Sequence, residues 1–512
     1  MFDYIVVGAG SAGCVLASRL TEDPKTTVLL LEAGGEDRRK EIHIPAAFSK
    51  LFKTECDWAY YTEPEPHLNQ RRLYWPRGKV LGGSSSINAM IHIRGNPRDY
   101  DRWREGGGEG WGFSDLAPYF SKLEKSNGGL LSVEPLRCVN PLSKVFVEAA
   151  MEIGLPRNED FNGSTQEGAG IYRVTQKKGR RFSAAAAYLR PALRRPNLTV
   201  HTQAQVPTVL FSRTRATGVR YVRGGRPAES LAGREVILAG GAINSPQLLM
   251  LSGIGPADHL RSLSIQPVAD LSGVGENLQD HLSVVTACES TKPITLAGAE
   301  TMASLLRFVL FGSGPLTSNV AEAGAFLKTR SDEQAPDLQL LFGPVYYLNH
   351  GFTRPEGHGF SVGPALLHPR SRGRIRLRSA DPFAPPAIEA HYLADPHDLE
   401  VLTEGVSLAR RIMQAKAFDA FRGAEVYPGP GVASHAAIVE YIRGMAETLY
   451  HPVGTCKMGS DAAAVVDSRL RVRGVDGLRV VDASIMPAII SGNTNTPTIV
   501  IAERAADLIR RG

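Results

Sequence analysis

The first 32 residues alternate between apolar runs and small polar residues in the pattern of one βαβ unit. Residues 3–7 (DYIVV) form a short continuous apolar run, which is typical of a buried parallel strand. Residues 14–20 (CVLASRL) place apolar side chains at helical spacing. Residues 27–31 (TVLLL) form a second buried run, which ends before Glu32. This order predicts a strand, a helix and a second strand.

The glycines between the first strand and the helix follow the G-x-G-x-x-G spacing of dinucleotide-binding turns. Gly8 permits a tight turn, Gly10 lets a pyrophosphate approach the backbone, and Gly13 lets the helix pack closely on the strand. Glu32 lies 19 positions after Gly13, where a carboxylate can accept hydrogen bonds from an adenosine ribose. The unit therefore predicts a dinucleotide site. Glu32 disfavours NADP, and the motif leaves NAD and FAD open.

Three later stretches also place small residues after an apolar run. In residues 76–95, Gly82, Gly83 and three serines can line a flat or anionic ligand, or form only a flexible turn. Residues 235–256 have the pattern of strand, glycines and helix, which fits the closing βα element of a nucleotide-binding sheet or plain architecture. The third stretch is residues 478–509.

The third stretch predicts a helix whose start faces a ligand. A strand ends at Asp482, a turn-rich loop carries Asn493 and Asn495, and an amphipathic helix begins at Pro497. The positive end of that helix would suit an electron-rich group, such as the N1–C2=O edge of a reduced flavin.

Composition favours an ordinary soluble chain with more than one substructure, because 512 residues exceed what one hydrophobic core accommodates. The net charge of +6 is spread along the chain, and its arginine-rich patches are typical of solvated strand faces, so we expect no nucleic-acid partner. The five cysteines form no C-x-x-C pair, which argues against a disulfide framework and a zinc site.

We expect a cytoplasmic protein, because the sequence shows no targeting signal. The chain begins without a signal-peptide pattern, and no apolar run reaches the ~20 residues of a membrane span. Residues 302–312 (MASLLRFVLFG) come nearest but contain Arg307. We expect a buried helix there, with a surface-seeking or entrance helix as the alternative.

Residues 449–459 (LYHPVGTCKMG) contain the most suggestive histidine, His451. A metal ligand is disfavoured because no H-x-x-x-H or C-x-x-C spacing surrounds it. A nucleophile pair with Cys456 lacks a fixed geometry on an irregular loop. A proton-transferring base and a packed structural side chain remain open.

Six ordered motifs resemble those of the glucose–methanol–choline oxidoreductases, FAD-dependent enzymes that mostly oxidise alcohols. The similarity spans nearly the whole chain and lies in GAGSAG, LEAGG, GKVLGGSSSINAMIHIRG, GGAINSPQLLMLSGIGP, HPVGTCKMG and VVDASIMP…SGNTNTPT. The resemblance implies an α/β fold: a Rossmann-like FAD-binding domain and a substrate domain built on an antiparallel sheet flanked by helices. We expect the FAD-binding domain in residues 1–149, 201–290 and 451–512, and the substrate domain in residues 150–200 and 291–450.

The resemblance also implies roles for particular residues. His451 would face the flavin and take the hydroxyl proton as a hydride leaves for flavin N5, and Asn493 would hold the substrate oxygen. FAD would be held non-covalently, because some relatives attach it through a histidine where this chain has Ile87. The implied FAD-binding residues are Gly8, Gly10, Ser11, Ala12, Gly13, Glu32, Ala33, Gly82, Gly83, Ser84, Asn88, Ala89, Met90, Val206, Ala239, Asp482, Ala483, Asn493, Thr494, Asn495 and Thr498.

The expected substrate wall is apolar and comprises Ile91, Ile93, Leu366, Leu449 and Tyr450. The resemblance places a strand within residues 373–393 in the sheet that floors this cavity. An apolar wall favours uncharged primary or aryl alcohols, with O2 or another acceptor taking the electrons. Glu322 could instead meet a cation such as choline, or belong to a buried hydrogen-bond network.

Other activities stay open. The resemblance admits a cyanohydrin lyase with a redox-silent FAD and a photochemical fatty-acid decarboxylase, although the His451–Asn493 pair argues against the latter. A non-catalytic or NAD-binding protein is the alternative outside the family. The specific alcohol, the acceptor and the oligomeric state do not follow from the sequence.

Overall fold

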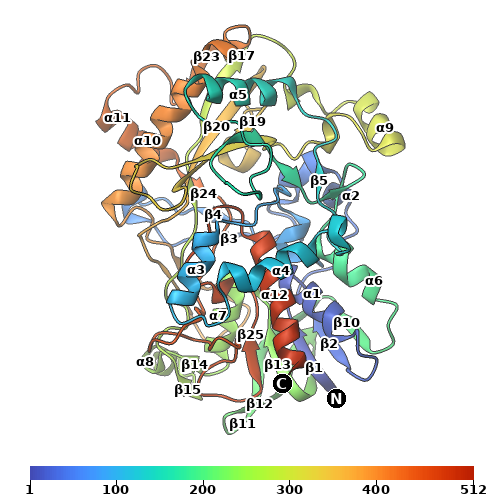
Figure 1. Ribbon diagram of the computed structural model, residues 1–512. Coiled ribbons are helices and arrows are strands. Elements are labelled where there is room, and N and C mark those ends of the chain that lie inside the picture. Colours follow the sequence, from blue (N-terminus) through green and yellow to red (C-terminus); the bar gives the residue numbers. More distant parts are fainter. Residues whose placement is uncertain (512) are drawn as a thin grey trace.

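The computed structural model describes residues 1–511 and has two halves, each built on its own sheet (Figure 1). Helices lie against both sheets, and the two chain ends lie together in the half that holds the first sheet. The α-helices are α1 (Ser11–Leu20), α2 (Lys40–His43), α3 (Pro97–Glu105), α4 (Phe113–Leu123), α5 (Pro141–Glu152), α6 (Arg190–Ala192), α7 (Gly241–Leu251), α8 (Ala257–Ser262), α9 (Met302–Phe311), α10 (Pro396–Met413), α11 (His435–Met445) and α12 (Asn495–Arg510).

The first sheet contains the predicted βαβ unit. Its parallel part runs β10 (Leu198–His201), β2 (Val28–Leu31), β1 (Phe2–Val7), β13 (Arg226–Leu238) and β25 (Leu478–Val480). The antiparallel strands β11 (Ala204–Ser212) and β12 (Arg215–Arg223) extend it through β13. The apolar runs pair as expected for buried parallel strands, with Ile5 beside Leu29 and both fully buried.

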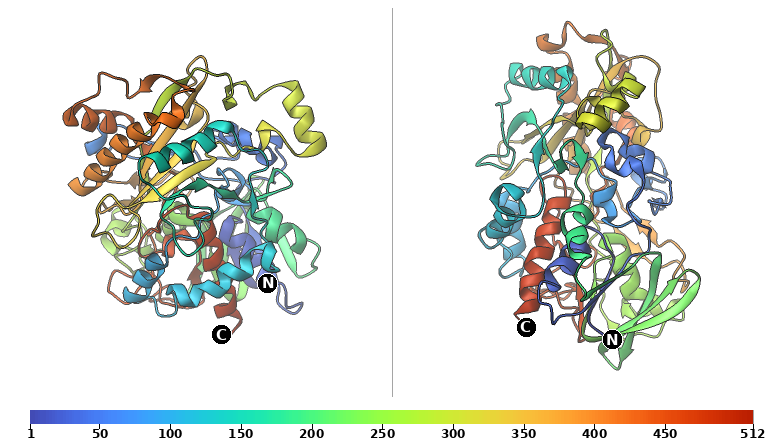
Figure 2. Two further views of the ribbon diagram at one scale, coloured as in Figure 1. Left: turned by 45° about the horizontal axis from the view of Figure 1, so that its top comes forward. Right: turned by 90° about the vertical axis from the view of Figure 1, so that its right-hand side faces the viewer.

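The second sheet is antiparallel. Its strands run β23 (Arg422–Tyr427), β17 (Thr286–Ser290), β20 (Gly359–Leu366), β19 (Leu338–Gly343), β18 (Ala323–Leu327) and β6 (Gly168–Ile171), and β16 (Leu282–Ser283) joins β20 to β24 (Glu447–Thr448). Helices α5 and α10 pack against it. Phe146 of α5 stacks on Phe342 of β19 with ring centroids 4.9 Å apart. The α/β fold with a second, antiparallel domain is confirmed, and Figure 2 shows the two halves from other sides.

Two strands and one helix cross the expected domain limits. Strand β10 pairs with β2, so residues 150–200 contribute to the first sheet as well as the second. Strand β17 and helix α5 belong to the second half, although they fall in segments expected to bind FAD. Backbone pairing across long sequence separations sets these limits, and the local hydrophobic pattern does not record it.

The strands expected to floor the cavity lie elsewhere. β21 (Arg374–Arg376) and β22 (Ala387–Glu389) form a separate two-stranded sheet. Ile375 and Ile388 pair there and are fully buried, and the Ile375 amide donates to the Gly275 carbonyl. These contacts draw the pair towards the first half, so the floor prediction is wrong.

Helix α1 and helix α12 are clamped together beside the first sheet. Arg19 of α1 makes two 2.8 Å bonds to Glu503 of α12, and Tyr188 donates to the same carboxylate. Glu503 is 1% exposed, so removal of one partner would leave a buried charge. The clamp fixes how the two helix starts are placed relative to each other.

Candidate active site

A cavity of about 410 Å³ lies between the two sheets. Strand residues of both sheets line it, including Val7 and Leu238 at strand ends of the first sheet and Leu341 and Gly363 within strands of the second. Most of the expected FAD-binding residues also line it: Gly8, Gly10, Ser11, Ala12, Glu32, Ala33, Gly83, Ser84, Asn88, Ala89, Met90, Val206, Ala239, Asp482, Ala483, Asn493, Thr494, Asn495 and Thr498. Gly13 and Gly82 lie behind the wall.

The three glycines of the first turn meet different constraints. A Cβ on Gly8, which has φ +101°, would lie 2.5 Å from the Ala239 carbonyl oxygen. A Cβ on Gly13 would overlap the Gly8 carbonyl oxygen. At Gly10 the nearest atom is 4.0 Å away, so a side chain there would point into open cavity space. Gly8 and Gly13 serve the fold, and Gly10 keeps the cavity free.

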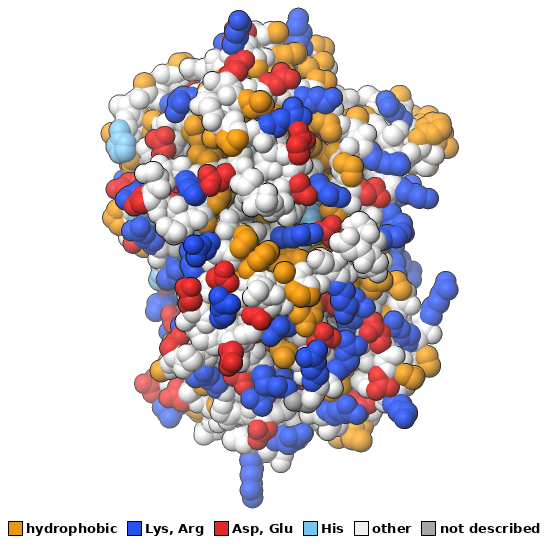
Figure 3. Space-filling model, viewed as in Figure 1, with side chains coloured by type: hydrophobic (Ala, Val, Ile, Leu, Met, Phe, Trp, Pro, Cys, Tyr) orange, Lys and Arg blue, Asp and Glu red, His pale blue; other side chains and the backbone are white. Residues whose placement is uncertain are grey.

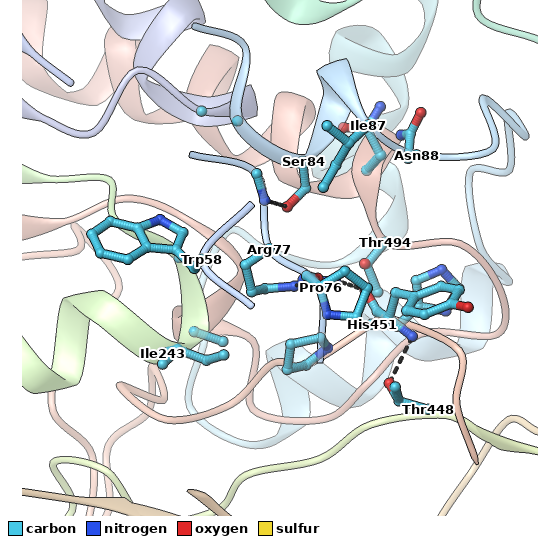
Figure 4. Close-up of a pocket in the computed structure, with 18 of the residues that line it drawn as sticks. Trp58, Pro76, Arg77, Ser84, Ile87, Asn88, Ile243, Thr448, His451 and Thr494 are labelled. Atoms are coloured by element: carbon cyan, nitrogen blue, oxygen red, sulfur yellow. Dashed lines mark hydrogen bonds between the residues drawn. The ribbon is translucent and has the colours of Figure 1, made fainter. Parts of the chain in front are cut away.

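The glycine–serine stretch touches this turn. A Cβ on Gly83 would lie 2.7 Å from Gly10 Cα, which shows that the two loops pass each other at backbone distance. The stretch forms a 3-10 helix, η3 (Gly83–Ser86). Ser84 Oγ accepts from the Gly78 amide at 3.2 Å, and Figure 4 shows Ser84 close to Arg77, with Ile87 and Asn88 further from His451 on the same cavity wall.

Glu32 sits at the end of β2 with its carboxylate turned to the backbone of the first turn. It accepts from the Ala9 amide at 2.8 Å and the Gly34 amide at 2.9 Å. Burial raises its pKa to about 7. No cation pairs with it in the described part of the chain, and it lines the cavity, so hydroxyl donors of a ligand would find acceptor lone pairs there.

Two helix starts face the cavity. Ser11 of α1 donates to the Asn495 side chain of α12 at 2.7 Å, and both residues line the wall. Neither helix has a side-chain cap at its start, so first-turn amides stay available to a ligand. Asp482 closes the corner by accepting from Gly241 and Ser245.

The cavity wall between the two halves carries a pair of polar side chains from distant segments. Asn493 Nδ2 lies 3.2 Å from His451 Nε2. Asn493 Oδ1 is buried and has no hydrogen-bond partner among residues 1–511. Such an acceptor is complete only when a donor enters the cavity.

A second histidine fixes which nitrogen of His451 carries the proton. His281 Nε2 lies 3.1 Å from the Leu367 carbonyl, which can only accept, so this nitrogen must donate. His281 Nδ1 is then an acceptor in the neutral ring, and it lies 2.9 Å from His451 Nδ1. His451 therefore donates through Nδ1. Its Nε2 lone pair is left facing Asn493 and the cavity.

The charge state agrees with this arrangement. Burial, then His281, then Arg77 hold the pKa of His451 well below its ordinary value of 6.5. Burial lowers the pKa of His281 to about 3. Both rings are therefore neutral at physiological pH, and His451 is ready to accept a proton.

Hydrogen bonds to Asp280 and Arg77 hold the backbone around His451 in place. Asp280 accepts from the His451 amide at 2.7 Å and from Thr448 Oγ1 at 2.5 Å, and it contacts the Tyr392 hydroxyl. Arg77 donates to the Tyr450 carbonyl at 2.5 Å. Tyr450 itself has φ +70°, and these bonds hold that unusual conformation beside the histidine.

The structure argues against two alternative roles for His451, a nucleophile pair with Cys456 and a metal ligand. Cys456 is fully buried and, within residues 1–511, forms no hydrogen bond with His451, and burial raises its thiol pKa well above the ordinary value. In the described residues, no group of three or more His, Cys, Asp or Glu side chains is placed to hold a metal.

The expected substrate residues divide into two sets. Ile91, Leu449 and Tyr450 line the cavity. Ile93 instead packs in a buried cluster with Phe161 and Phe326, and Leu366 lies in the main core.

Glu322 belongs to a buried network. Its carboxylate accepts from the Asn140 amide and Ser143 Oγ at 2.7 Å, and from Ser318 Oγ at 2.6 Å. It is 1% exposed and does not line the cavity, so it offers no site for a cationic substrate.

Sequence reasoning missed part of the wall. Phe48, Phe52 and Tyr347 line the cavity and form an aromatic surface, with Phe48 and Phe52 at a 5.9 Å centroid distance. His281 and Asp280 were also missed, although both stand in the polar step QDH between Leu278 and Leu282. That step was the available signal.

Family models described as GMC oxidoreductase match residues 2–283 and 369–502. The chain belongs to the GMC oxidoreductase family. Membership makes this GMC oxidoreductase an enzyme that acts on CH–OH groups.

Named relatives cover the whole chain. The GMC oxidoreductase is 48% identical to an alcohol dehydrogenase [acceptor] of Pseudomonas putida, over 100% of this chain and 96% of that one. It is 46% identical to the mitochondrial choline dehydrogenase of Mus musculus, over 99% and 89%. Among solved structures, pyridoxine 4-oxidase from Mesorbium loti superimposes with a TM-score of 0.91 at 32% identity, covering 100% of both chains. A formate oxidase variant of Aspergillus oryzae RIB40, studied for FAD modification, has a TM-score of 0.94 at 27% identity, over 100% and 98%.

Proposed function

We propose that this GMC oxidoreductase oxidises an uncharged primary alcohol, aryl or aliphatic, to the aldehyde, with FAD held non-covalently. The observation that carries the proposal is the His451–Asn493 pair: a neutral base and an amide with unused hydrogen-bonding capacity on one cavity wall. FAD, when bound, supplies the acceptor for the hydride that leaves the alcohol carbon.

The chain's own residues would move the proton and hold the oxygen. His451 Nε2 takes the hydroxyl proton, because its Nδ1 is already committed to His281. Asn493 Nδ2 carries a second hydrogen beyond the one directed at His451, and it would donate to the substrate oxygen and stabilise the charge that develops there. Asp280 and Arg77 keep the backbone of this corner in place while the proton moves.

The cavity residues fit FAD. The open space at Gly10 suits a pyrophosphate, Glu32 suits a ribose, and the uncapped start of α12 suits the polar edge of a flavin ring. Ile87 lines the same cavity and offers no nucleophilic atom for a covalent link. Denaturation should therefore release all of the flavin from the chain, and flavin colour remaining with precipitated protein would contradict the non-covalent assignment.

The electrostatics of the cavity favour an uncharged substrate. Of the three carboxylates on its wall within residues 1–511, Glu32 and Asp482 are bound to backbone amides of the first half. The third, Glu447, is paired with Arg71 at 3.3 Å and with His350. No carboxylate on this wall is free for a quaternary ammonium, whereas the aromatic surface of Phe48 and Phe52 suits an apolar alcohol.

The test is an anaerobic titration of the purified enzyme with alcohols while flavin absorbance is recorded. Aryl and aliphatic primary alcohols should bleach the flavin, and choline should do so poorly. Faster bleaching by choline would overturn the uncharged-substrate assignment. No bleaching by any alcohol would favour the lyase or the light-driven decarboxylase instead. Admitting air after bleaching separates oxidase from dehydrogenase, because only an oxidase recovers its colour quickly.

A further inference from the structure

Helix α9 presents apolar side chains to solvent. It was expected to be buried, and that prediction is wrong. Phe308 alone of its residues is buried, at 1% exposure. The exposed fractions are 71% for Met302, 38% for Leu305, 53% for Leu306, 55% for Val309, 68% for Leu310 and 70% for Phe311. At ~100° per residue, all of these except Phe311 fall within roughly 140° of the helix circumference, so they form an outward stripe.

The stripe is held in place by a well-anchored helix. Thr301 caps its start by accepting from the Ser304 amide at 3.1 Å. Arg137 caps its end by donating to the Gly312 carbonyl at 3.0 Å. Phe308 is the inward anchor, with Arg180 lying 5.0 Å from its ring centre. The apolar face is therefore a fixed feature of the surface, and fraying does not account for its exposure.

Four cations without carboxylate partners lie on α9 or beside its C-terminal end and inward side. Within residues 1–511, none of Arg137, Lys178, Arg180 and Arg307 forms an ion pair. Lys178 and Arg180 belong to the hairpin whose Gly179 packs against the Gly312 carbonyl at the end of α9. Figure 3 shows the apolar patch at the margin of the molecule with Lys and Arg side chains close by.

We propose that α9 docks on the surface of an anionic lipid bilayer, with its apolar stripe among the acyl chains and these cations at the headgroups. An apolar helical face bordered by basic side chains is the arrangement that binds such surfaces. Among the described residues, no helix is long and apolar enough to cross a membrane, so the association is peripheral.

The two competing occupants fit less well. In a symmetric dimer the same patch meets itself, so the four cations of one copy would face the four of the other. A protein partner of the stable kind covers about 800 Å² on each side. A ten-residue helix at the margin of the molecule, as Figures 1 and 2 show, is convex and small for that purpose.

Docking through α9 would bring the rim of the cavity near the bilayer. Glu300, just before α9, pairs with Lys50 at 2.6 Å and lies 3.8 Å from Arg354. Arg354 follows Thr353, which is exposed and also lines the cavity. The cavity rim and α9 thus belong to one connected patch of surface, and an apolar compound dissolved in the bilayer would reach the rim directly.

The test is vesicle flotation of the full-length holoenzyme. Vesicles of equimolar phosphatidylcholine and phosphatidylglycerol should carry the enzyme upwards, and vesicles of phosphatidylcholine alone should carry much less. The double variant Leu306→Asp, Leu310→Asp should lose binding to both. Arg180→Gln should weaken binding to the anionic vesicles about fivefold, the expected contribution of one cation near such a surface.

Leu231→Asp is the matched control, because Leu231 is 52% exposed and lies on β13 in the other half. It should float like the wild type, and all variants should keep the wild-type melting temperature and flavin content. Failure of the wild-type enzyme to float with anionic vesicles would overturn the proposal. So would equal flotation of the double variant, or a wild-type dimer that the double variant converts to monomer.

Discussion

The glycine turn at residues 8–13 and the proposed catalytic corner around His451 line the same cavity, yet they are specified in different ways. The turn depends on missing side chains: Gly8 and Gly13 have no room for a Cβ, and Gly10 leaves the cavity open. The corner depends on the direction of its hydrogen bonds. His281 donates to the Leu367 carbonyl and accepts from His451 Nδ1. One region is a local backbone shape, and the other is assembled from distant segments.

This contrast teaches which substitutions act on folding, on cofactor retention and on chemistry. Substitutions in the turn act by steric collision of the new side chain, so their effect depends on which glycine is replaced. Changes in the corner leave the packing intact and act on the position of one proton. Substitutions that separate these effects test the comparison.

The largest effect is expected from Gly10→Val. The side chain would extend into the open space where the pyrophosphate belongs, so the protein should fold but retain no FAD and show no activity. Flavin absorbance and circular dichroism measure these two results. Gly13→Val is the contrasting variant: its side chain would overlap the Gly8 carbonyl oxygen, so the fold itself should be destabilised. A yellow, fully loaded Gly10→Val protein would show that the turn has been misassigned.

The next effect is the loss of the base. His451→Ala should keep bound FAD, because the turn is untouched, while the rate of flavin reduction falls by ~10²–10⁴-fold. Stopped-flow absorbance under anaerobic conditions measures this rate. Asn493→Ala should lower the same rate by less, since it removes a positioning amide and leaves the proton acceptor in place. Unchanged reduction in His451→Ala would remove this residue from the base role.

The same contrast explains how far the sequence could predict the molecule. The βαβ unit follows from apolar runs and glycines within 32 residues, so its strands and its position on the cavity are predictable. The separate pairing of Arg374–Arg376 with Ala387–Glu389 is not, because short strands carry no signal for the sheet they join.

At the catalytic corner, the family resemblance gave the His451–Asn493 pair but not the residue behind it. His281 lies 170 positions from His451, and its role depends on a backbone carbonyl that carries no side-chain signal. The prediction that helix α9 is buried was wrong for a related reason. The sequence of an apolar helix with one arginine is equally compatible with a protein core and with a bilayer surface.

A smaller effect should follow from changing the histidine behind the base. His281→Phe leaves His451 Nδ1 without its acceptor, so the ring no longer has a fixed tautomer. Loss of one buried hydrogen bond at ~1–3 kcal/mol corresponds to a reduction rate about 5–150-fold slower. His281→Gln supplies an amide oxygen that can accept from Nδ1, and it should restore part of the rate. Equal flavin reduction rates in His281→Phe and His281→Gln would mean that His281 acts through packing. A pH profile of the reduction rate that shifts in His281→Phe alone would support the tautomer role.

The smallest expected effect is the response of the reduction rate to pH. A histidine base is lost as pH falls through its pKa, and an ordinary imidazole would have lost half of its neutral form at pH 6.5. Burial, with His281 and Arg77 facing the ring, lowers the His451 pKa, so the rate should stay nearly constant from about pH 8 down past 6.5. Asp280, whose pKa burial raises to about 6, also titrates at this corner, and its protonation is half complete only near pH 6. A midpoint at or above 6.5 in the anaerobic reduction rate would contradict a neutral base held by its surroundings. It would place His451 in contact with bulk water, and then the corner would not be the closed, directional assembly that distinguishes it from the turn.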